Sequence, residues 1–120
     1  MDLVVTNYLS PAKIFKNITT LDNRWVKIRL KGRSSNRFGI GSSVTVTMGD
    51  KSYRKLVSCG SQYLSQEDTT LTFGLGKEEY IDSIQINWPG YADQFVEGPF
   101  KSNQLLDIHQ EGNVTQHTLN

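Results

Sequence analysis

The chain has 120 residues, of which 37% are hydrophobic, and a net charge of +1. This length fits one domain, and the hydrophobic fraction supports a core and excludes a disordered chain. The absence of any apolar run of about 18 residues excludes a membrane-spanning helix. The N-terminus also has no basic segment followed by an apolar one, so no signal peptide is visible.

The charges are unequally distributed along the chain. Residues 1–60 hold eleven Lys and Arg and three Asp and Glu, whereas residues 61–120 hold two and nine. Because opposite charges on paired strands are mildly favourable, we interpret this asymmetry as pairing between the two halves of a β domain. No basic cluster is interleaved with stacking aromatic residues, so nucleic-acid binding is not predicted.

The first 17 residues contain two short apolar segments, residues 2–7 and 12–17, separated by a loop. They form either the first hairpin of the domain or a separate structural piece. Both alternatives are open from the pattern alone.

The rest of the chain alternates between apolar and polar residues with the period of two that is typical of half-buried strands. Strands are expected at residues 26–31, 44–48, 52–59, 70–75, 83–88, 94–97 and 104–109, with turns at Gly49-Asp50, Gly76, Pro89-Gly90, Gly98-Pro99 and Gly112-Asn113. The sequence therefore predicts an all-β fold, an antiparallel β-sandwich or barrel-like domain with little helix beyond one turn at residues 65–68. The predicted core comprises Val26, Ile28, Leu30, Val44, Val46, Leu71, Phe73, Ile84 and Ile86.

The residues that usually carry catalysis or bind metals are few. Cys59 is the only cysteine, which excludes an internal disulfide and a cysteine-based metal cluster, and we expect a buried, inert thiol. His109 and His117 have no sequence neighbours arranged as a zinc site or a catalytic triad would need. We predict no catalytic residue, no bound metal and no cofactor, and therefore no enzyme.

Gly39-Ile40-Gly41 resembles part of a dinucleotide-binding loop, but the pattern fails. The third glycine is replaced by Val44, and the segment leads into a strand instead of a helix. The preferred interpretation is a turn in which glycine allows a close approach of the backbone.

Two polar groups are the candidate ligand-binding residues: Ser35, Asn36 and Arg37, and Gln62, Tyr63 and Gln66. The first group would bind a carboxylate, a sulfate or a sugar. Its structural alternative is an Arg37 that holds loop carbonyls or pairs with Glu67 or Asp68. The second group lies in a long loop and offers the amide and aromatic side chains of a carbohydrate site, and its alternative is a loop folded over one end of the sandwich.

Several motifs occur in order between about residues 24 and 110: Ser35-Asn36-Arg37-Phe38-Gly39-Ile40-Gly41, Gly60-Ser61-Gln62-Tyr63-Leu64-Ser65-Gln66, Leu71-Thr72-Phe73-Gly74-Leu75-Gly76 and Ile86-Asn87-Trp88-Pro89-Gly90. Together they resemble the ASPIC/UnbV domain, a module at the C-terminus of secreted FG-GAP/VCBS propeller-repeat proteins. The resemblance implies that residues 18–120 are this domain and that residues 1–17 are a remnant of a propeller blade. Asp2 matches only the final acidic position of that repeat's calcium loop, so no calcium site is predicted.

The resemblance further implies a non-catalytic extracellular module with an architectural or binding role. The expected partners are the propeller domain of the parent protein and a glycan or protein ligand, and the expected location is secreted or extracellular. The alternative function is a carbohydrate-binding module of a secreted glycan-processing protein.

Overall fold

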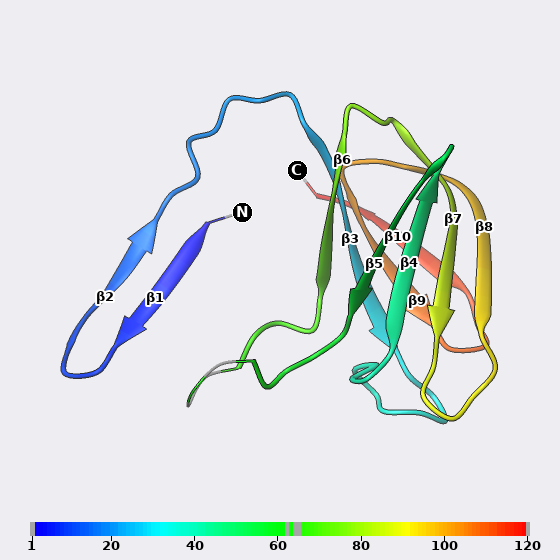
Figure 1. Ribbon diagram of the computed structural model, residues 1–120, viewed down its shortest axis with the longest axis horizontal. Coiled ribbons are helices and arrows are strands. Elements are labelled where there is room, and N and C mark those ends of the chain that lie inside the picture. Colours follow the sequence, from blue (N-terminus) through cyan, green and yellow to red (C-terminus); the bar gives the residue numbers. More distant parts are fainter. Residues whose placement is uncertain (1, 62, 64–65, 120) are drawn as a thin grey trace.

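The computed structural model describes residues 2–61, 63 and 66–119, and these residues form ten strands and no helix. The all-β prediction is thereby confirmed. Within the described part of the chain there is accordingly no helix with the length and apolar character needed to cross a membrane. The strands form a small hairpin sheet and two four-stranded sheets (Figure 1).

The first four-stranded sheet has the order β10-β9-β3-β6. Its pairs are antiparallel except β3 and β9, which run parallel, so the sheet is mixed. This pairing joins two strands that are far apart in the sequence. The bounds are β3 (Arg24–Lys31), β6 (Leu71–Gly76), β9 (Gln104–His109) and β10 (Val114–Thr118).

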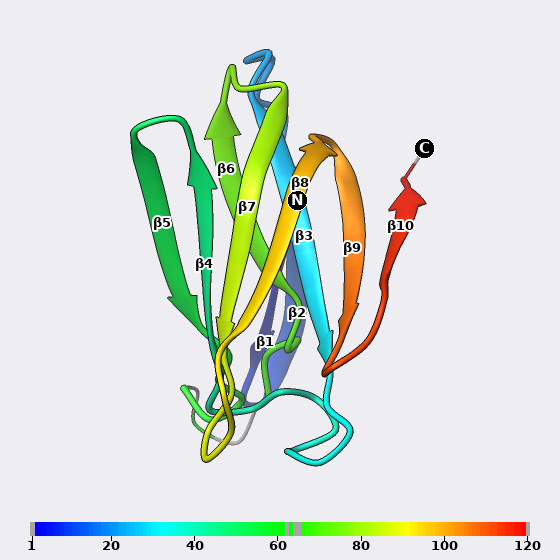
Figure 2. The ribbon, with the colours of Figure 1, turned by 90° about the vertical axis from the view of Figure 1, so that its right-hand side faces the viewer.

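The second four-stranded sheet is antiparallel throughout and has the order β5-β4-β7-β8. It stacks on the first sheet, which gives the sandwich seen from two sides in Figures 1 and 2. The bounds are β4 (Ser43–Met48), β5 (Lys51–Leu56), β7 (Tyr80–Asn87) and β8 (Gln94–Lys101).

The core lies between the two sheets and is filled by every second residue of their inner strands. Eight of the nine predicted core residues are at most 2% exposed, and the ninth, Leu71, is partly buried and packs against the cluster. Trp88 is also buried, at 1% exposure, although it follows the end of β7. Further core residues that were not predicted are Met48, Val57, Leu75, Ile81, Phe100, Leu106 and Ile108.

The N-terminal hairpin consists of β1 (Leu3–Asn7) and β2 (Ser10–Phe15) and stands apart from the sandwich in Figure 1. The two strands pair only with each other among the described residues. Asp2 closes the base of the hairpin, since its Oδ1 accepts a hydrogen bond of 2.8 Å from the backbone N–H of Asn17. A hairpin is compatible with a first hairpin of the domain and with a remnant of a propeller blade, so both interpretations of residues 1–17 stay predictions.

Apart from smaller shifts at other strand ends, the structure differs from the sequence prediction at three places. The strand predicted at residues 52–59 ends at Leu56, and Cys59 is half-buried instead of buried. The turn predicted at Gly98-Pro99 is wrong, because β8 continues through both residues. It does so as an edge strand, where the missing N–H of proline is tolerated. Residues 66–68 are not helical, and Ser65, the first residue of the predicted helical turn, lies outside the described residues. The sequence prediction also missed β10.

The predicted pairing of opposite charges between the halves of the chain is confirmed by three ion pairs. Arg29 Nε lies 2.7 Å from Asp107 Oδ1, while two longer pairs of 3.9 and 3.8 Å join Arg24 to Glu79 and Lys51 to Glu78. In each pair the basic residue belongs to residues 1–60 and the acidic residue to residues 61–120.

Gly39 permits the close approach expected of a turn glycine. Its φ is +67°, a conformation that side chains disfavour, and an added Cβ would lie 2.7 Å from the Cβ of Leu30. Because Leu30 is buried in the core, it cannot move aside. The glycine is therefore required by both backbone and packing.

We predict that Gly39→Ala lowers the free energy of unfolding by about 2–4 kcal/mol, since it adds a core clash to left-handed strain. Gly49→Ala is the matched control, because Gly49 has φ +53° and open space around it, so only about 1–2 kcal/mol is expected. Urea unfolding of both variants measures the difference. Equal losses would show that the contact with Leu30 contributes nothing.

Candidate functional site

Three long connections meet at one end of the sandwich: the β3–β4, β5–β6 and β7–β8 loops (Figures 1 and 2). The turn between β9 and β10 lies at the same end. The first two loops contain all six candidate ligand-binding residues. Of these, Gln62 lies outside the described residues.

The side chain of Gln110, which follows β9, holds the β3–β4 loop. Its Oε1 accepts hydrogen bonds of 2.9–3.0 Å from the backbone N–H groups of residues 33, 34 and 35 and from the hydroxyl of Ser35. Four donors converge on one atom, which therefore must be the oxygen of the amide. Gln110 is only 3% exposed, so its side-chain oxygen is satisfied by the loop and not by solvent.

Asn36 stabilises the next turn of the loop. Its Oδ1 accepts from the N–H of Phe38 at 3.0 Å and of Ile40 at 3.3 Å, and its carbonyl accepts from the N–H of Gly39 at 2.8 Å. Such local bonds are the reason that asparagine favours turns. The polar atoms of Ser35 and Asn36 are thus used to shape the loop.

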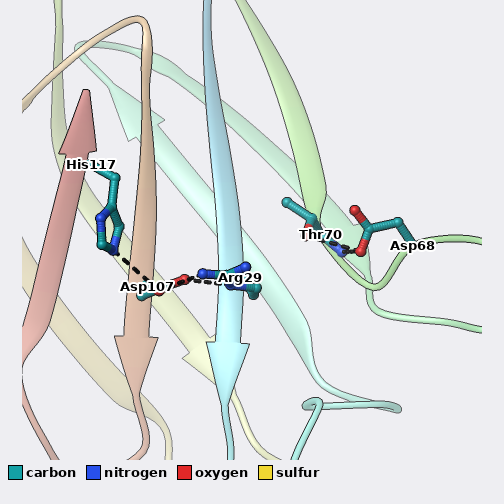
Figure 3. Close-up of polar contacts among 5 residues, drawn as sticks. All are labelled: Arg29, Asp68, Thr70, Asp107 and His117. Atoms are coloured by element: carbon teal, nitrogen blue, oxygen red, sulfur yellow. Dashed lines mark hydrogen bonds and ion pairs between the residues drawn. The ribbon is translucent and has the colours of Figure 1, made fainter. Parts of the chain in front are cut away.

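Arg37 is different, because its side chain is exposed and none of the described residues accepts a hydrogen bond from its guanidinium. Two carbonyls of the loop accept from other donors: that of Arg37 accepts from Gly32 N–H at 3.0 Å, and that of Ser34 accepts from the Tyr91 hydroxyl at 2.6 Å. Asp68 bonds to Thr70 instead (Figure 3). The structural alternative for Arg37 therefore finds no acceptor among the described residues, and both interpretations of its side chain stay predictions. The loop presents this cation to solvent beside Phe38, which is 54% exposed.

The second candidate group is exposed as well. Tyr63 is 90% exposed and Gln66 is exposed, and no hydrogen bond joins either of them to Arg37. The fold therefore brings the described members of the two predicted groups to the same end without a hydrogen bond between the groups. Their role in ligand binding stays a prediction.

Two further residues that sequence reasoning missed hold this end together. Gln94 Oε1 accepts from Trp88 Nε1 at 3.0 Å and from the N–H of Glu111 at 3.3 Å, and its Nε2 donates to the carbonyl of His109 at 3.0 Å. The Tyr91 hydroxyl ties the β7–β8 loop to Ser34. The bonds of Gln94 to His109 and Glu111 and of Tyr91 to Ser34 join residues 15 to 57 positions apart, so no local sequence signal predicts them.

The strongest charge interaction lies on the outer face of the β10-β9-β3-β6 sheet (Figure 3). Arg29 donates two hydrogen bonds of 2.7 Å to the two carboxylate oxygens of Asp107, and His117 Nε2 lies 3.3 Å from Asp107 Oδ2. The hydrogen bond from Arg29 lowers the pKa of Asp107, while burial opposes this effect. The same bond raises the pKa of Arg29. This carboxylate is saturated by its partners, as in a structural ion pair.

Among the described residues, no group of three or more His, Cys, Asp or Glu side chains is placed to hold a metal ion. Within the described part of the chain, one acidic residue pairs with a histidine, Asp107 with His117 at 3.3 Å. A nucleophile held by a base was not found among the described hydrogen bonds.

The sequence comparisons identify the family of this chain. The family model described as ASPIC and UnbV matches residues 32–115, which include both candidate loops. Cartilage acidic protein 1 of Xenopus tropicalis is 28% identical over 98% of this chain and 19% of its own length. The human protein of the same name is 27% identical over 74% of this chain and 14% of its own length. The chain thus spans about a fifth or less of the curated relatives it matches.

The contrast between Gln110 and Arg37 gives a paired prediction. Gln110→Ala should lower the free energy of unfolding by about 2–3 kcal/mol, because several donors lose their only acceptor. Arg37→Ala should change it by no more than about 0.5 kcal/mol, so that any loss of partner binding in this variant reports on contact with the partner. Chemical denaturation of both variants is the measurement. A similar loss in the two variants would contradict the assignment of Gln110 as the residue that holds the loop.

The lowered pKa of Asp107 predicts a pH dependence of stability. Because the unfolded chain binds this proton more readily, the stabilisation is present above about pH 4 and is lost as the pH falls through the lower folded value. Asp107→Asn should therefore cost about 1 kcal/mol at pH 7, a value reduced by the partial exposure of Arg29. The cost should shrink in acid, as followed by urea unfolding across this range. A cost independent of pH would refute the charge-based explanation.

Proposed function

We propose, because this chain belongs to the ASPIC and UnbV family, that it is a non-catalytic extracellular module at the C-terminus of a propeller-repeat protein. In this role it braces the propeller and presents its loop end to a partner. The much greater length of the relatives supports a place within a larger protein. The extracellular location rests on the family resemblance and on relatives named for cartilage.

The observation that carries the architectural part is the N-terminal hairpin. Val4 pairs with Ile14 on one face and Leu3 with Phe15 on the other, and all four side chains are between 53% and 76% exposed. Strands with apolar residues on both faces are typical of a sheet that is covered on both sides. A lone two-stranded hairpin is marginally stable in water. The hairpin is therefore the segment that another part of the parent protein, the propeller domain, would cover.

The apolar surface continues along the connection from the hairpin to β3. Ile18 and Leu21 are 83% and 69% exposed, and Tyr8 and Leu9 at the tip of the hairpin are 92% and 89% exposed. A soluble domain rarely leaves so many large apolar side chains uncovered in one segment. This distribution supports a docked hairpin more than a freely solvated one.

The binding part of the proposal concerns the loop end. The loop backbone is held by Gln110 and Asn36, while Arg37 and Phe38 are exposed. A shaped loop that presents a cation and an aromatic ring has the chemistry of a recognition surface. The ligand class is either a protein or a glycan.

The alternative proposal is a carbohydrate-binding module of a secreted glycan-processing protein. It depends on Gln62, Tyr63 and Gln66, of which the two described residues are exposed as sugar stacking and hydrogen bonding require. Loss of saccharide binding in Tyr63→Ala would support this loop as the sugar site.

Hydrogen exchange of the chain alone and of the longer parent protein tests the docked hairpin. In the chain alone the amides of residues 3–15 should exchange rapidly, whereas those of β3, β4 and β7 should be slow. In the longer protein the hairpin amides should become protected. Ile14→Asp should lower the melting temperature of the longer protein and leave the isolated chain nearly unchanged. Leu56→Asp, at another exposed position (61%, against 76% for Ile14) in edge strand β5, is the control. Equal exchange of the hairpin in both proteins would refute the proposal.

A further inference from the structure

The outer face of the β5-β4-β7-β8 sheet carries a row of side chains that crosses all four strands. Thr45 pairs directly with Arg54 on one side and with Gln85 on the other, and Gln85 pairs with Phe95. Directly paired residues share a face of a sheet. Since Val44, Val46, Ile84 and Ile86 fill the inner face, this row points away from the core.

A polar cleft of about 200 Å³ lies along this row. We name it the Asp93 cleft, after the residue of the β7–β8 loop that closes one side, while Arg54 closes the other. Its floor is formed by the central strands β4 and β7. The cleft is lined by Ser43, Thr45, Arg54, Gln85, Asn87 and Asp93.

Hydrogen bonds hold the walls of the cleft in place. Asp93 accepts from Gln85 Nε2 at 3.0 Å and from Asn87 Nδ2 at 2.6 Å, one bond to each carboxylate oxygen. On the other side, Arg54 Nη2 donates at 2.8 Å to the hydroxyl of Ser43, which is only 7% exposed. Side chains fixed in this way lose little conformational entropy when a ligand binds.

These bonds leave a mixed set of donors and acceptors available to a ligand. Among the described residues, the amide oxygens of Gln85 and Asn87 accept no side-chain bond, and the guanidinium of Arg54 donates only to Ser43. Each carboxylate oxygen of Asp93 also retains accepting capacity. Adjacent hydroxyl groups, which both donate and accept, match such a set.

The charges of the cleft restrict the class of ligand. Arg54 and Asp93 lie on opposite sides and form no ion pair with each other. An anionic ligand would be repelled by the carboxylate of Asp93, and a cationic ligand would be repelled by the guanidinium of Arg54. A neutral ligand with several hydroxyl groups is repelled by neither charge.

Phe95 adds an apolar surface at the end of the row. Its side chain is 69% exposed and lies beside Gln85, on strand β8. A single exposed aromatic residue is common on protein surfaces. Next to a cleft of hydroxyl-binding groups, however, its flat face can pack against the C–H face of a sugar ring.

We propose that the Asp93 cleft binds a neutral pyranose residue of a glycan. Asp93, Gln85, Asn87 and Arg54 hydrogen-bond to the ring hydroxyls, and Phe95 packs against the ring. This site lies on the sheet face, its lining includes neither Tyr63 nor Gln66, and it does not depend on the docking of the hairpin.

A glycan array that contains neutral, sialylated and sulfated glycans, followed by calorimetry with the neutral oligosaccharide that binds best, tests the site with the full chain. Neutral glycans should bind, and Phe95→Ala and Asp93→Asn should each weaken binding by at least about tenfold. Phe95→Ala should keep the melting temperature of the unchanged chain, because Phe95 is exposed. Asp93→Asn should lower it only slightly, because the amide oxygen of asparagine still accepts one of the two wall bonds. Tyr80→Ala and Asp50→Asn are the matched controls at exposed positions outside the cleft, and they should bind normally.

Three outcomes would overturn the site. The first is binding to none of the neutral glycans. The second is saccharide binding that survives both cleft variants and is lost in Tyr63→Ala, which would place the sugar at the loop. The third is a preference for sialylated or sulfated glycans. None of these outcomes would affect the hydrogen-exchange test of the hairpin, so the two proposals fail separately.

Discussion

The parallel pairing of β3 with β9 is the constraint on which the arrangement of the loop end depends. The two strands are related by a constant separation of 78 residues, and side chains fix this register along its length. At the start of β3, the N–H of Trp25 donates to Asn103 Oδ1, and the N–H of Asn103 donates to the carbonyl of Trp25. In the middle, Arg29 donates two hydrogen bonds to the carboxylate of Asp107. At the end, the N–H of Gln110 donates to the carbonyl of residue 31, which places the Gln110 amide beneath the β3–β4 loop. A shift of the strands would remove all of these contacts together.

The strands and most of the core could be predicted from the sequence, because they depend on local alternation. Val26, Ile28 and Leu30 face inward for the same reason that their polar neighbours face outward. The parallel partner of β3 could not be predicted, since a strand pattern carries no information on which distant strand completes its hydrogen bonds. Strand β8 was cut short at Gly98-Pro99, because those residues usually mark turns and only an edge position allows the strand to continue.

The sequence predicted which loops form the candidate site, but it did not predict the hydrogen bonds that hold them. The loop with Ser35 and Asn36 was recognised, but the residue that shapes it, Gln110, lies about 75 residues away. Its importance arises from four donors that converge after folding. The sequence left open whether Arg37 holds the loop or contacts a ligand, and in the structure two loop carbonyls accept from Gly32 N–H and from the Tyr91 hydroxyl instead. The Asp93 cleft was also invisible in the sequence, because its residues come from β4, β5, β7 and the following loop.

Nuclear Overhauser contacts in an isotopically labelled chain measure the parallel pairing of β3 with β9 most directly. Parallel pairing predicts backbone contacts between β3 and β9 at the constant separation seen here, with Ile28 near Leu106 and Leu30 near Ile108. It also predicts slow exchange of the backbone N–H of Gln110, which donates to the carbonyl of Lys31 at the end of β3. Contacts whose separation changes from one residue to the next would indicate antiparallel pairing. That result, or no contact between the strands, would contradict the account of how the loop end is held.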